Sequence, residues 1–323
     1  MKPRLSWGWL LLFIAALTLL MVTPGAGERK KEGPAVPPGR QPGEVELEVE
    51  LLPKNESGQA VVSQGEVFLV RIKDPRNLLQ KASASWKGRT IPCLPHHQHP
   101  GWLHGLGAID RTREPGTYTL SIQLVSRGGE FEELEKELRV QKTRYPSGRL
   151  SVAGDKVELS RAAKNRVREE RKAFKNAWDS SSYVRLWSGP FIRPTGGRIT
   201  SEFGERRVYN NGKLKNVHRG VDLSAGVGEP IKATATGKVM LAGFCFLEGG
   251  LVIMDHGGGL FTLYCHLSQI KVGPGEIVDK GSVIGLAGNT GRVTGPHLHW
   301  GCGVQGVRVD PMSLLKLNRW LEE

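Results

Sequence analysis

The stretch Thr294-Gly295-Pro296-His297-Leu298-His299-Trp300 places two histidines at alternate positions directly after a Gly-Pro turn. Alternate side chains of a β-strand share one face, so His297 and His299 are expected to point into one cleft. Leu298 and Trp300 are expected to point into the core. The stretch therefore predicts a β-rich domain in the C-terminal part of the chain, with two imidazoles at one metal-sized space.

A second stretch, His218-Arg219-Gly220-Val221-Asp222, lies about eighty residues upstream. The same alternation puts His218 and Asp222 on one side, and Gly220 leaves room for a close neighbour. An open zinc site takes three protein ligands and a water, and the nitrogen and oxygen donors of His and Asp suit zinc. Each stretch alone is weak evidence, because a single histidine in a Gly-rich β region is more often structural than a ligand.

A third segment, Tyr264-Cys265-His266-Leu267, changes the case. The three pieces, in this order and spacing, resemble the lysostaphin-type (LytM-like) zinc metallopeptidases, which cut peptidoglycan cross-links. The resemblance covers roughly residues 186–317. It also includes the runs Gly196-Gly197-Arg198-Ile199-Thr200-Ser201-Glu202-Phe203-Gly204-Glu205-Arg206-Arg207, Leu223-Ser224-Ala225 and Asp255-His256-Gly257.

The resemblance implies a fold, a metal and a role for each polar residue. The fold is an antiparallel β peptidase domain of the lysostaphin, or duplicated-hybrid-motif, type. One Zn²⁺ per chain is held by three ligands, and a zinc-activated water attacks the peptide carbonyl. The implied ligands are His218, Asp222 and His299, and the implied proton-transfer residues are His266 and His297.

Four further residues lie within the region of resemblance: Tyr209, His256, Arg206 and Arg207. Tyr209 lies nine residues before His218, in a loop that in the family can bring a tyrosine towards the oxyanion; its alternative role is packing. His256 resembles a turn residue of the family and is expected to be structural. Arg206 and Arg207 are candidates for a substrate carboxylate or for a surface salt bridge.

Composition and the first residues indicate where the protein acts. A net charge of +13 favours a polyanionic partner, which includes nucleic acid, anionic lipid and bacterial wall alike. Lys2 and Arg4 precede an apolar run, Leu5–Val22, and small residues follow at 25–27. Residues 1–27 are therefore expected to be a signal peptide or a retained N-terminal anchor. We expect an exported protein of the periplasm or cell envelope, with no nucleic-acid partner.

The rest of the chain is expected to be mainly β. Residues 28–43 form a Pro- and Gly-rich linker, and residues 44–142 an immunoglobulin-like β-sandwich. Residues 143–185 link it to a peptidase domain at 186–317, which a tail at 318–323 follows. The expected strands of the sandwich lie at 44–52, 65–72, 82–92, 103–109, 117–125 and 134–140.

The linker contains the one long helical pattern, Leu159–Trp178, with Ser160 as its N-cap. Its expected apolar stripe consists of Ala162, Val167, Phe174 and Trp178. The other face is strongly basic. A solvated linking helix is the first interpretation, and a basic arm that contacts anionic wall polymer or membrane is the alternative.

Four cysteines stand at positions 93, 245, 265 and 302. A disulfide between Cys265 and Cys302 is conceivable in an exported protein, but buried free thiols are preferred. Strand alternation predicts that Cys265 faces away from His266, and Cys302 away from His297 and His299. Cys93 also begins a histidine-rich tract, for which a loop of exposed histidines is favoured over a metal site. The histidines of this tract are His96, His97, His99 and His104.

The sequence patterns suggest three functions. The first is a zinc endopeptidase that hydrolyses peptide cross-links of peptidoglycan, working as a monomer. The second is a catalytically silent LytM-like protein that binds the wall or activates another hydrolase, although such relatives usually lack a ligand and here all five positions are filled. The third is a biotinyl or lipoyl carrier, suggested by the hairpin pattern of 271–285, but Lys280 lies in an ordinary turn. The bond that is cut stays open between a D-alanyl–diaminopimelate cross-link and a glycine bridge.

Overall fold

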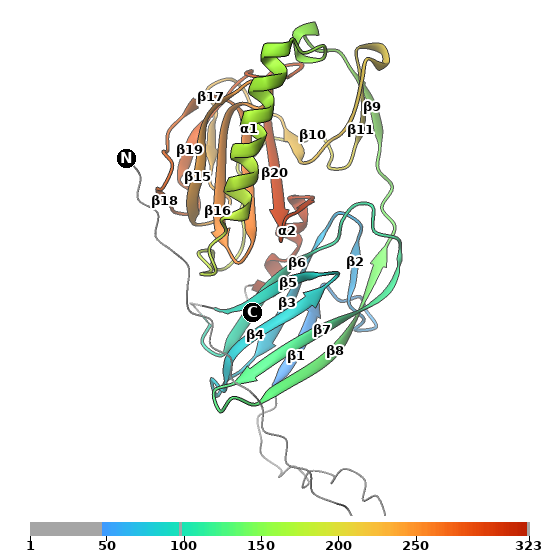
Figure 1. Ribbon diagram of the computed structural model, residues 1–323, viewed down its shortest axis with the longest axis vertical. Helices are drawn as coiled ribbons and strands as arrows, with labels where there is room; N and C mark the ends of the chain where they lie inside the picture. The colour runs from blue at the N-terminus through green and yellow to red at the C-terminus, as the bar shows by residue number, and fades with distance from the viewer. Residues whose placement is uncertain (1–46, 97–98, 322–323) are drawn as a thin grey trace, which may run out of the picture. The chain divides into compact units, whose positions relative to one another are not determined.

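The computed structural model describes residues 47–96 and 99–321, and it is mainly β (Figure 1). The expected leader at 1–27 and linker at 28–43 lie outside the described residues. Within the described ranges, no helix combines the length and the apolar character needed to cross a membrane.

The first eight strands form one hydrogen-bonded path in the order β1-β3-β6-β5-β4-β7-β8-β2. β5 pairs with both β4 and β6 and so connects its two halves. The immunoglobulin-like class of this region stays a prediction. The strands are β1 (Glu48–Leu52), β2 (Val61–Ser63), β3 (Val67–Lys73), β4 (Leu79–Trp86), β5 (Arg89–Pro95), β6 (Trp102–Ala108), β7 (Gly116–Ser126) and β8 (Phe131–Gln141).

The predicted single strand at 82–92 is wrong, because the chain turns within it. Lys87 and Gly88 have φ angles of 47° and 77°, and they join β4 to β5 as a two-residue hairpin. Lysine is not a residue type that predicts a positive φ in a hairpin turn. The apolar pattern of 82–92 therefore predicted one continuous strand. β2 was not predicted, whereas the other five expected strands overlap observed ones.

β3 is buried on both faces, which explains its nearly unbroken apolar sequence. Phe68, Val70 and Ile72 face the core of the first region. Val67 and Leu69 face a second cluster, which contains Trp187, Phe191 and residues near the C-terminus.

The peptidase-like region is a large antiparallel sheet, ordered β10-β13-β20-β17-β16-β15-β18, with β14, β19 and β21 paired to its sides. Its members are β10 (Ile199–Ser201), β13 (Val221–Leu223), β14 (Pro230–Lys232), β15 (Gly237–Cys245), β16 (Gly249–Gly257), β17 (Leu260–Ile270), β18 (Ile277–Val278), β19 (Val283–Ala287), β20 (Leu298–Val304) and β21 (Val307–Val309). Leu298 and Trp300 are fully buried in the core below β20, as the alternation of that strand predicted.

A small three-stranded sheet joins the linker to this region. β9 (Ser147–Leu150) runs parallel to β11 (Arg206–Tyr209), which pairs antiparallel with β12 (Leu214–Val217). Short 3₁₀ turns follow β9 at Gly154–Lys156 and β11 at Asn210–Gly212. The linker therefore contributes a strand beside the segment that leads to His218.

Helix α1 (Arg161–Asp179) confirms the predicted helix, and the Ser160 side chain accepts a hydrogen bond from the Ala163 N–H at 3.2 Å. The apolar stripe contains Ala163 where Ala162 was expected, because Ala162 is exposed. Phe174 and Trp178 pack against a cluster on β16 and β17 that includes Leu251, Phe261 and Leu263. Figure 1 shows α1 lying across this face of the sheet.

The C-terminal residues are packed and do not form a free tail up to Leu321. Two short helices, α2 (Met312–Lys316) and α3 (Asn318–Leu321), end the described chain, and Leu321 is buried. The Ser313 hydroxyl accepts a hydrogen bond from the Val67 N–H at 3.2 Å. The strand region and the peptidase-like region therefore share a core.

Candidate metal centre and cleft

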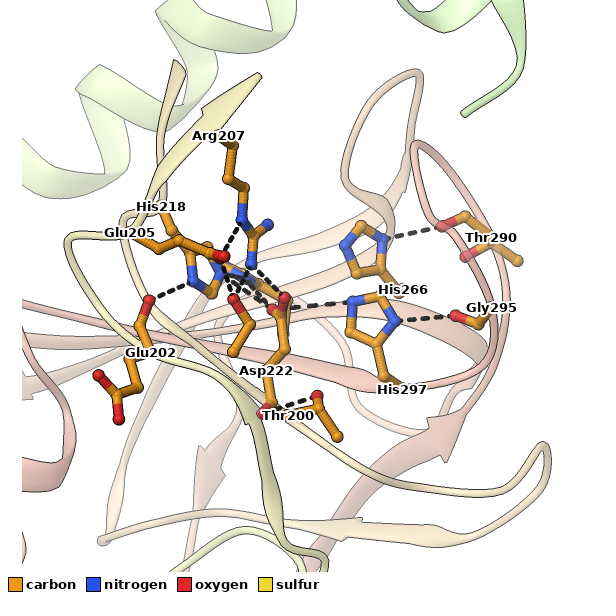
Figure 2. A network of polar contacts seen from close by, with 12 residues as sticks. Thr200, Glu202, Glu205, Arg207, His218, Asp222, His266, Thr290, Gly295 and His297 are labelled. Carbon is orange, nitrogen blue, oxygen red and sulfur yellow. Dashed lines mark hydrogen bonds and ion pairs between the residues drawn. The ribbon is translucent and has the colours of Figure 1, made fainter. Parts of the chain in front are cut away.

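Three polar side chains, two from neighbouring strands and one from the loop before β13, lie close enough to share an ion. Figure 2 labels two of them, His218 and Asp222. Asp222 of β13 lies directly opposite His299 of β20 in the sheet register. His218 lies in the loop that leads into β13. Asp222 Oδ1 lies 2.9 Å from His218 Nε2 and 2.8 Å from His299 Nδ1. The two histidine nitrogens are themselves 2.9 Å apart.

Gly220 makes this approach possible. A Cβ on Gly220 would lie 2.4 Å from the Trp300 carbonyl oxygen and 2.8 Å from Cε1 of the His299 ring. Both distances are far below van der Waals contact, so any side chain here would displace the ligand strand. The expected space beside Gly220 is confirmed.

The orientation of His218 is fixed by the backbone. Its Nδ1 lies 2.8 Å from the Glu202 carbonyl oxygen, which can only accept, so Nδ1 carries the proton. Nε2 then keeps its lone pair and points at Asp222 and His299. This is the arrangement in which a neutral imidazole binds a metal.

Arg207 holds the second oxygen of the Asp222 carboxylate at 2.6 Å, while its Nε donates to Glu205 at 2.9 Å. Burial opposes ionisation of Asp222, but the neighbouring His218 and His299 side chains keep its pKa well below the usual range. The sequence makes Arg207 a candidate for binding a substrate carboxylate. In the structure its guanidinium instead forms ion pairs with Glu205 and Asp222. Figure 2 shows Arg207 and His297 approaching the Asp222 carboxylate from different sides.

The donor set fits a zinc ion. Bonds of about 2.0–2.1 Å in a tetrahedral site separate the ligand atoms by about 3.3 Å. The three observed separations are 2.8–2.9 Å, so a small outward movement of each side chain would admit the ion. In the part of the chain that the structure describes, His218, Asp222 and His299 are the one group of His, Cys, Asp or Glu close enough to share an ion.

His266 and His297 lie beside the ligand group with their rings 4.9 Å apart. His266 Nδ1 is 2.8 Å from the Thr290 carbonyl oxygen, and His297 Nδ1 is 2.8 Å from that of Gly295. Each Nδ1 therefore carries a proton, and each Nε2 keeps a lone pair. The His297 Nε2 lies 3.7 Å from Asp222 Oδ1.

His266 has an unusual backbone conformation, with φ at 67°. This left-handed region costs a residue other than glycine about 1–3 kcal/mol and is enriched at functional sites. It coincides with irregular pairing between β16 and β17, which turns the imidazole towards the cavity. Burial, together with the neighbouring His297 and His299, lowers the pKa of His266 to about 3. His266 is therefore neutral at neutral pH.

The conformation of His266 also explains a wrong prediction about Cys265. Cys265 lies opposite His299 in the register of β17 and β20, and it lines the same cavity as His266 and His299. Strict alternation cannot hold across a residue with positive φ, so neighbours 265 and 266 face one space. Cys265 is nevertheless buried and free, as are Cys93 and Cys302, and Cys245 is free and partly buried.

Tyr209 ends strand β11 and is not in the loop where it was expected. It is buried and lines a cavity of about 320 Å³ together with Asp222, His266 and His297. The Arg292 guanidinium lies 5.1 Å from the centre of its ring. His256 is structural as predicted, because its nitrogens contact the Thr236 carbonyl and the Thr262 hydroxyl at 2.9 and 2.7 Å.

The described histidines of the second tract are not exposed, contrary to the favoured prediction. His96 and His104 are buried, with their rings 5.0 Å apart, and the His99 ring lies 4.6 Å from that of His96. The His99 backbone N–H donates to His96 Nδ1 at 3.1 Å, which occupies that lone pair. His97 lies outside the described residues.

Some features of the site escaped sequence reasoning. The carbonyls of Glu202, Thr290 and Gly295 orient three histidines, and no side-chain pattern encodes a carbonyl position. Trp178 and Arg308, far apart in sequence, line a cavity of about 730 Å³ with His218, His266 and His299. Sequence spacing gave no signal for either residue.

Comparisons with known proteins agree with this geometry. Residues 216–311 match the model of peptidase family M23. Peptidoglycan DD-endopeptidase ShyA of Vibrio cholerae is 41% identical over 121 residues, which are 38% of this chain and 27% of that protein. DD-carboxypeptidase/endopeptidase Mpg of Neisseria meningitidis is 40% identical over 119 residues, 36% of this chain and 27% of that protein.

A solved structure extends the likeness beyond the peptidase-like region. The crystal structure of a putative peptidase M23 from Pseudomonas aeruginosa has a TM-score of 0.59 and 27% identity. The match covers 78% of this chain and 94% of that one. In the two curated relatives, ShyA and Mpg, the residues matched by this chain span about a quarter of each protein's length. The resemblance seen in the histidine motifs is thus confirmed, and the chain carries a domain of peptidase family M23.

Proposed function

We propose that the protein is a zinc metalloendopeptidase that hydrolyses peptide cross-links of bacterial peptidoglycan. The observation that carries the proposal is the convergence of three ligand atoms within 2.9 Å, flanked by two histidines whose Nε2 atoms keep a lone pair. The names of the relatives ShyA and Mpg support the substrate.

Each residue of the ligand group has a defined task in this proposal. His218, Asp222 and His299 would hold one zinc ion, and Arg207 would keep the Asp222 carboxylate oriented. The bound zinc would supply Lewis acidity and an acidified water at neutral pH.

His266 and His297 would move the protons. A neutral imidazole with its Nε2 lone pair directed into the cavity can accept a proton from the attacking water and return it to the leaving amine. The Thr290 and Gly295 carbonyls hold both rings in the required tautomer. Tyr209, on the wall of the same cavity, is proposed to donate a hydrogen bond to the developing oxyanion.

A catalytically silent wall-binding or hydrolase-activating role is the alternative. It is not favoured, because a silent domain needs neither an intact ligand group nor two oriented proton-transfer residues. Here all five residues are present and lie around one space.

The setting of the enzyme is part of the proposal. The basic start and apolar run at 5–22 support export to the periplasm or envelope, with or without a retained anchor. The boundaries 44–142, 143–185 and 186–317 are proposed as immunoglobulin-like, linker and lysostaphin-type peptidase regions of a monomer. The exposed basic residues of α1 are proposed to contact anionic wall polymer or membrane.

The test is digestion of defined cross-linked peptidoglycan by the zinc-loaded full chain, with mass analysis of the released fragments. We expect cleavage at one type of peptide bond, abolished by a chelator and restored by zinc. Wall containing D-alanyl–diaminopimelate cross-links and wall containing glycine bridges are compared in parallel. Release of no fragment from either wall by protein that holds one zinc per chain would refute the proposal and favour the silent alternative.

A further inference from the structure

Gly301 and Gly303 of β20 leave space for other side chains on the strand face beside the candidate metal centre. His299, Gly301 and Gly303 share one face of the strand, and Arg308 of β21 lies opposite Gly303. A Cβ on Gly303 would lie 2.1 Å from the Trp178 ring, and one on Gly301 would lie 3.5 Å from Nη1 of Arg308. The glycines thus admit an indole and leave room for a guanidinium on the face that carries a proposed zinc ligand.

The Arg308 guanidinium packs against an aromatic ring. Its Cζ lies 4.1 Å from the centre of the Trp178 ring, which α1 brings over the sheet. Burial lowers the pKa of Arg308 to about 10, and the nearby Arg219 adds to this effect. Among the described residues, no ion pair within 4.0 Å involves Arg308, Arg219 or Arg292.

The charges that line the adjoining cavity of about 730 Å³ are mostly positive. Its acidic members are Asp179, which pairs with Lys175, and Glu248. Burial raises the pKa of Glu248, so its ionised form is disfavoured. The basic members that line the cavity are Arg171, Lys175, Arg207, Arg219, Arg292 and Arg308.

A partly desolvated guanidinium without a counter-charge is unfavourable by itself, and an anionic ligand would relieve that cost. A planar guanidinium binds a carboxylate through two parallel N–H···O bonds, which also fixes orientation. Positions two residues apart on a strand are about 7 Å apart. The guanidinium beside Gly301 therefore lies on the same strand face as His299, two residues of extended chain along β20.

We propose that Arg308, assisted by Arg219, is the subsite for a free carboxylate on the substrate residue that adjoins the scissile amide. The inference rests on the proposed peptidase function and narrows its substrate class. Such a carboxylate is present on a diamino acid that is cross-linked through one amine, and also at the free end of a peptide stem. The two sources share the same recognition chemistry.

The test uses the zinc-loaded full chain and four synthetic peptides. Two are cross-linked stems and two are uncross-linked stems, and each pair has the carboxylate next to the scissile bond either free or converted to a primary amide. We measure kcat and KM by fragment release, and peptide affinity by calorimetry. Because amidation changes only the substrate, this comparison holds even if a variant folds poorly.

We expect kcat/KM to be about 10- to 100-fold higher for the free acid, mostly through KM. Arg308→Gln should abolish this preference, and Arg308→Lys should restore part of it. Arg139→Gln removes the same charge from an exposed position of β8 and should keep the preference. The source of the carboxylate is decided by whether cross-linked or uncross-linked acid is cut faster.

Equal kcat/KM and equal affinity for acid and amide would overturn the inference, as would a preference that survives in Arg308→Gln. If no peptide is cleaved, the proposed function fails, and the affinities still decide the inference. An acid-selective affinity that depends on Arg308 would then support the subsite alone.

Discussion

The chain contains two histidine clusters that differ in what surrounds the rings. In the first, His218 and His299 point their nitrogens at the Asp222 carboxylate, and Arg207 holds that carboxylate from behind. In the second, His96 and His104 pack ring edge against ring face, 5.0 Å apart, inside the eight-strand region. Both clusters contain buried imidazoles, but within residues 47–96 and 99–321 only the first brings three ligand atoms, a carboxylate oxygen among them, close enough to share an ion.

The direction of the backbone hydrogen bonds separates the two clusters further. Carbonyl oxygens accept hydrogen bonds from the Nδ1–H groups of His218, His266 and His297. Each Nε2 therefore keeps a lone pair that can bind a metal or a proton. At His96 a backbone N–H occupies the Nδ1 lone pair instead. A histidine tract therefore predicts a metal site only when a carboxylate and correctly oriented carbonyls accompany it.

The largest effect is expected from removing a ligand of the first cluster. His299→Ala should eliminate bound zinc and lower kcat/KM at least about a thousandfold, because several kcal/mol of transition-state stabilisation depend on the ion. Metal analysis and peptide hydrolysis are measured on the same sample. His99→Ala is the matched control from the second cluster and should change neither; loss of zinc from that variant would break the comparison.

The second-largest effect is expected from removing a proposed proton-transfer residue beside the zinc ligands. His266→Ala should keep one zinc per chain and lower kcat by about a hundred- to ten-thousandfold, because a proton-transfer group is lost without a ligand. Zinc content and kcat are the two readouts. An unchanged kcat would remove His266 from the mechanism, and loss of zinc would make it a ligand.

Support of the carboxylate by Arg207 should have an intermediate effect. Arg207→Gln should weaken zinc binding by about 10- to 100-fold, because Asp222 loses the ion pair that orients it. Competition with a chelator of known affinity gives the zinc affinity. Arg206→Gln, at the exposed neighbouring position, is the control. Equal affinities in the two variants would show that Arg207 does not support the site.

The smallest effect concerns the second cluster and appears in stability alone. Burial lowers the pKa of His104 to about 2 from 6.5, so between these values the unfolded chain binds a proton that the folded chain excludes. Stability from this group is present above pH 6.5 and falls as the pH falls. His104→Phe should therefore lose less thermal stability than the wild type between about pH 7.5 and about pH 5, by a few degrees. Equal losses in the two proteins would contradict this.

Much of the site could be predicted because its pattern is local. Strand alternation at 297–300 and the small residue Gly220 each follow from a few neighbouring residues, and both predictions are confirmed. The N-cap Ser160 is local in the same sense.

What could not be predicted depends on non-local geometry. The positive φ of His266 interrupts the alternation on which the prediction for Cys265 rested. The register of β21 against β20 puts Arg308 opposite Gly303, and its guanidinium lies beside Gly301. The two-sided burial of β3 also required partners near the C-terminus. Pairwise spacing along a sequence carries none of this information.

The central claim is that the first cluster binds zinc and the second does not. Anomalous scattering at the zinc edge from crystals of the zinc-loaded protein tests this most directly. We predict one peak per chain, within about 2.0–2.2 Å of His218 Nε2, His299 Nδ1 and an Asp222 oxygen. A peak among His96, His99 and His104, or no peak between His218 and His299, would contradict it.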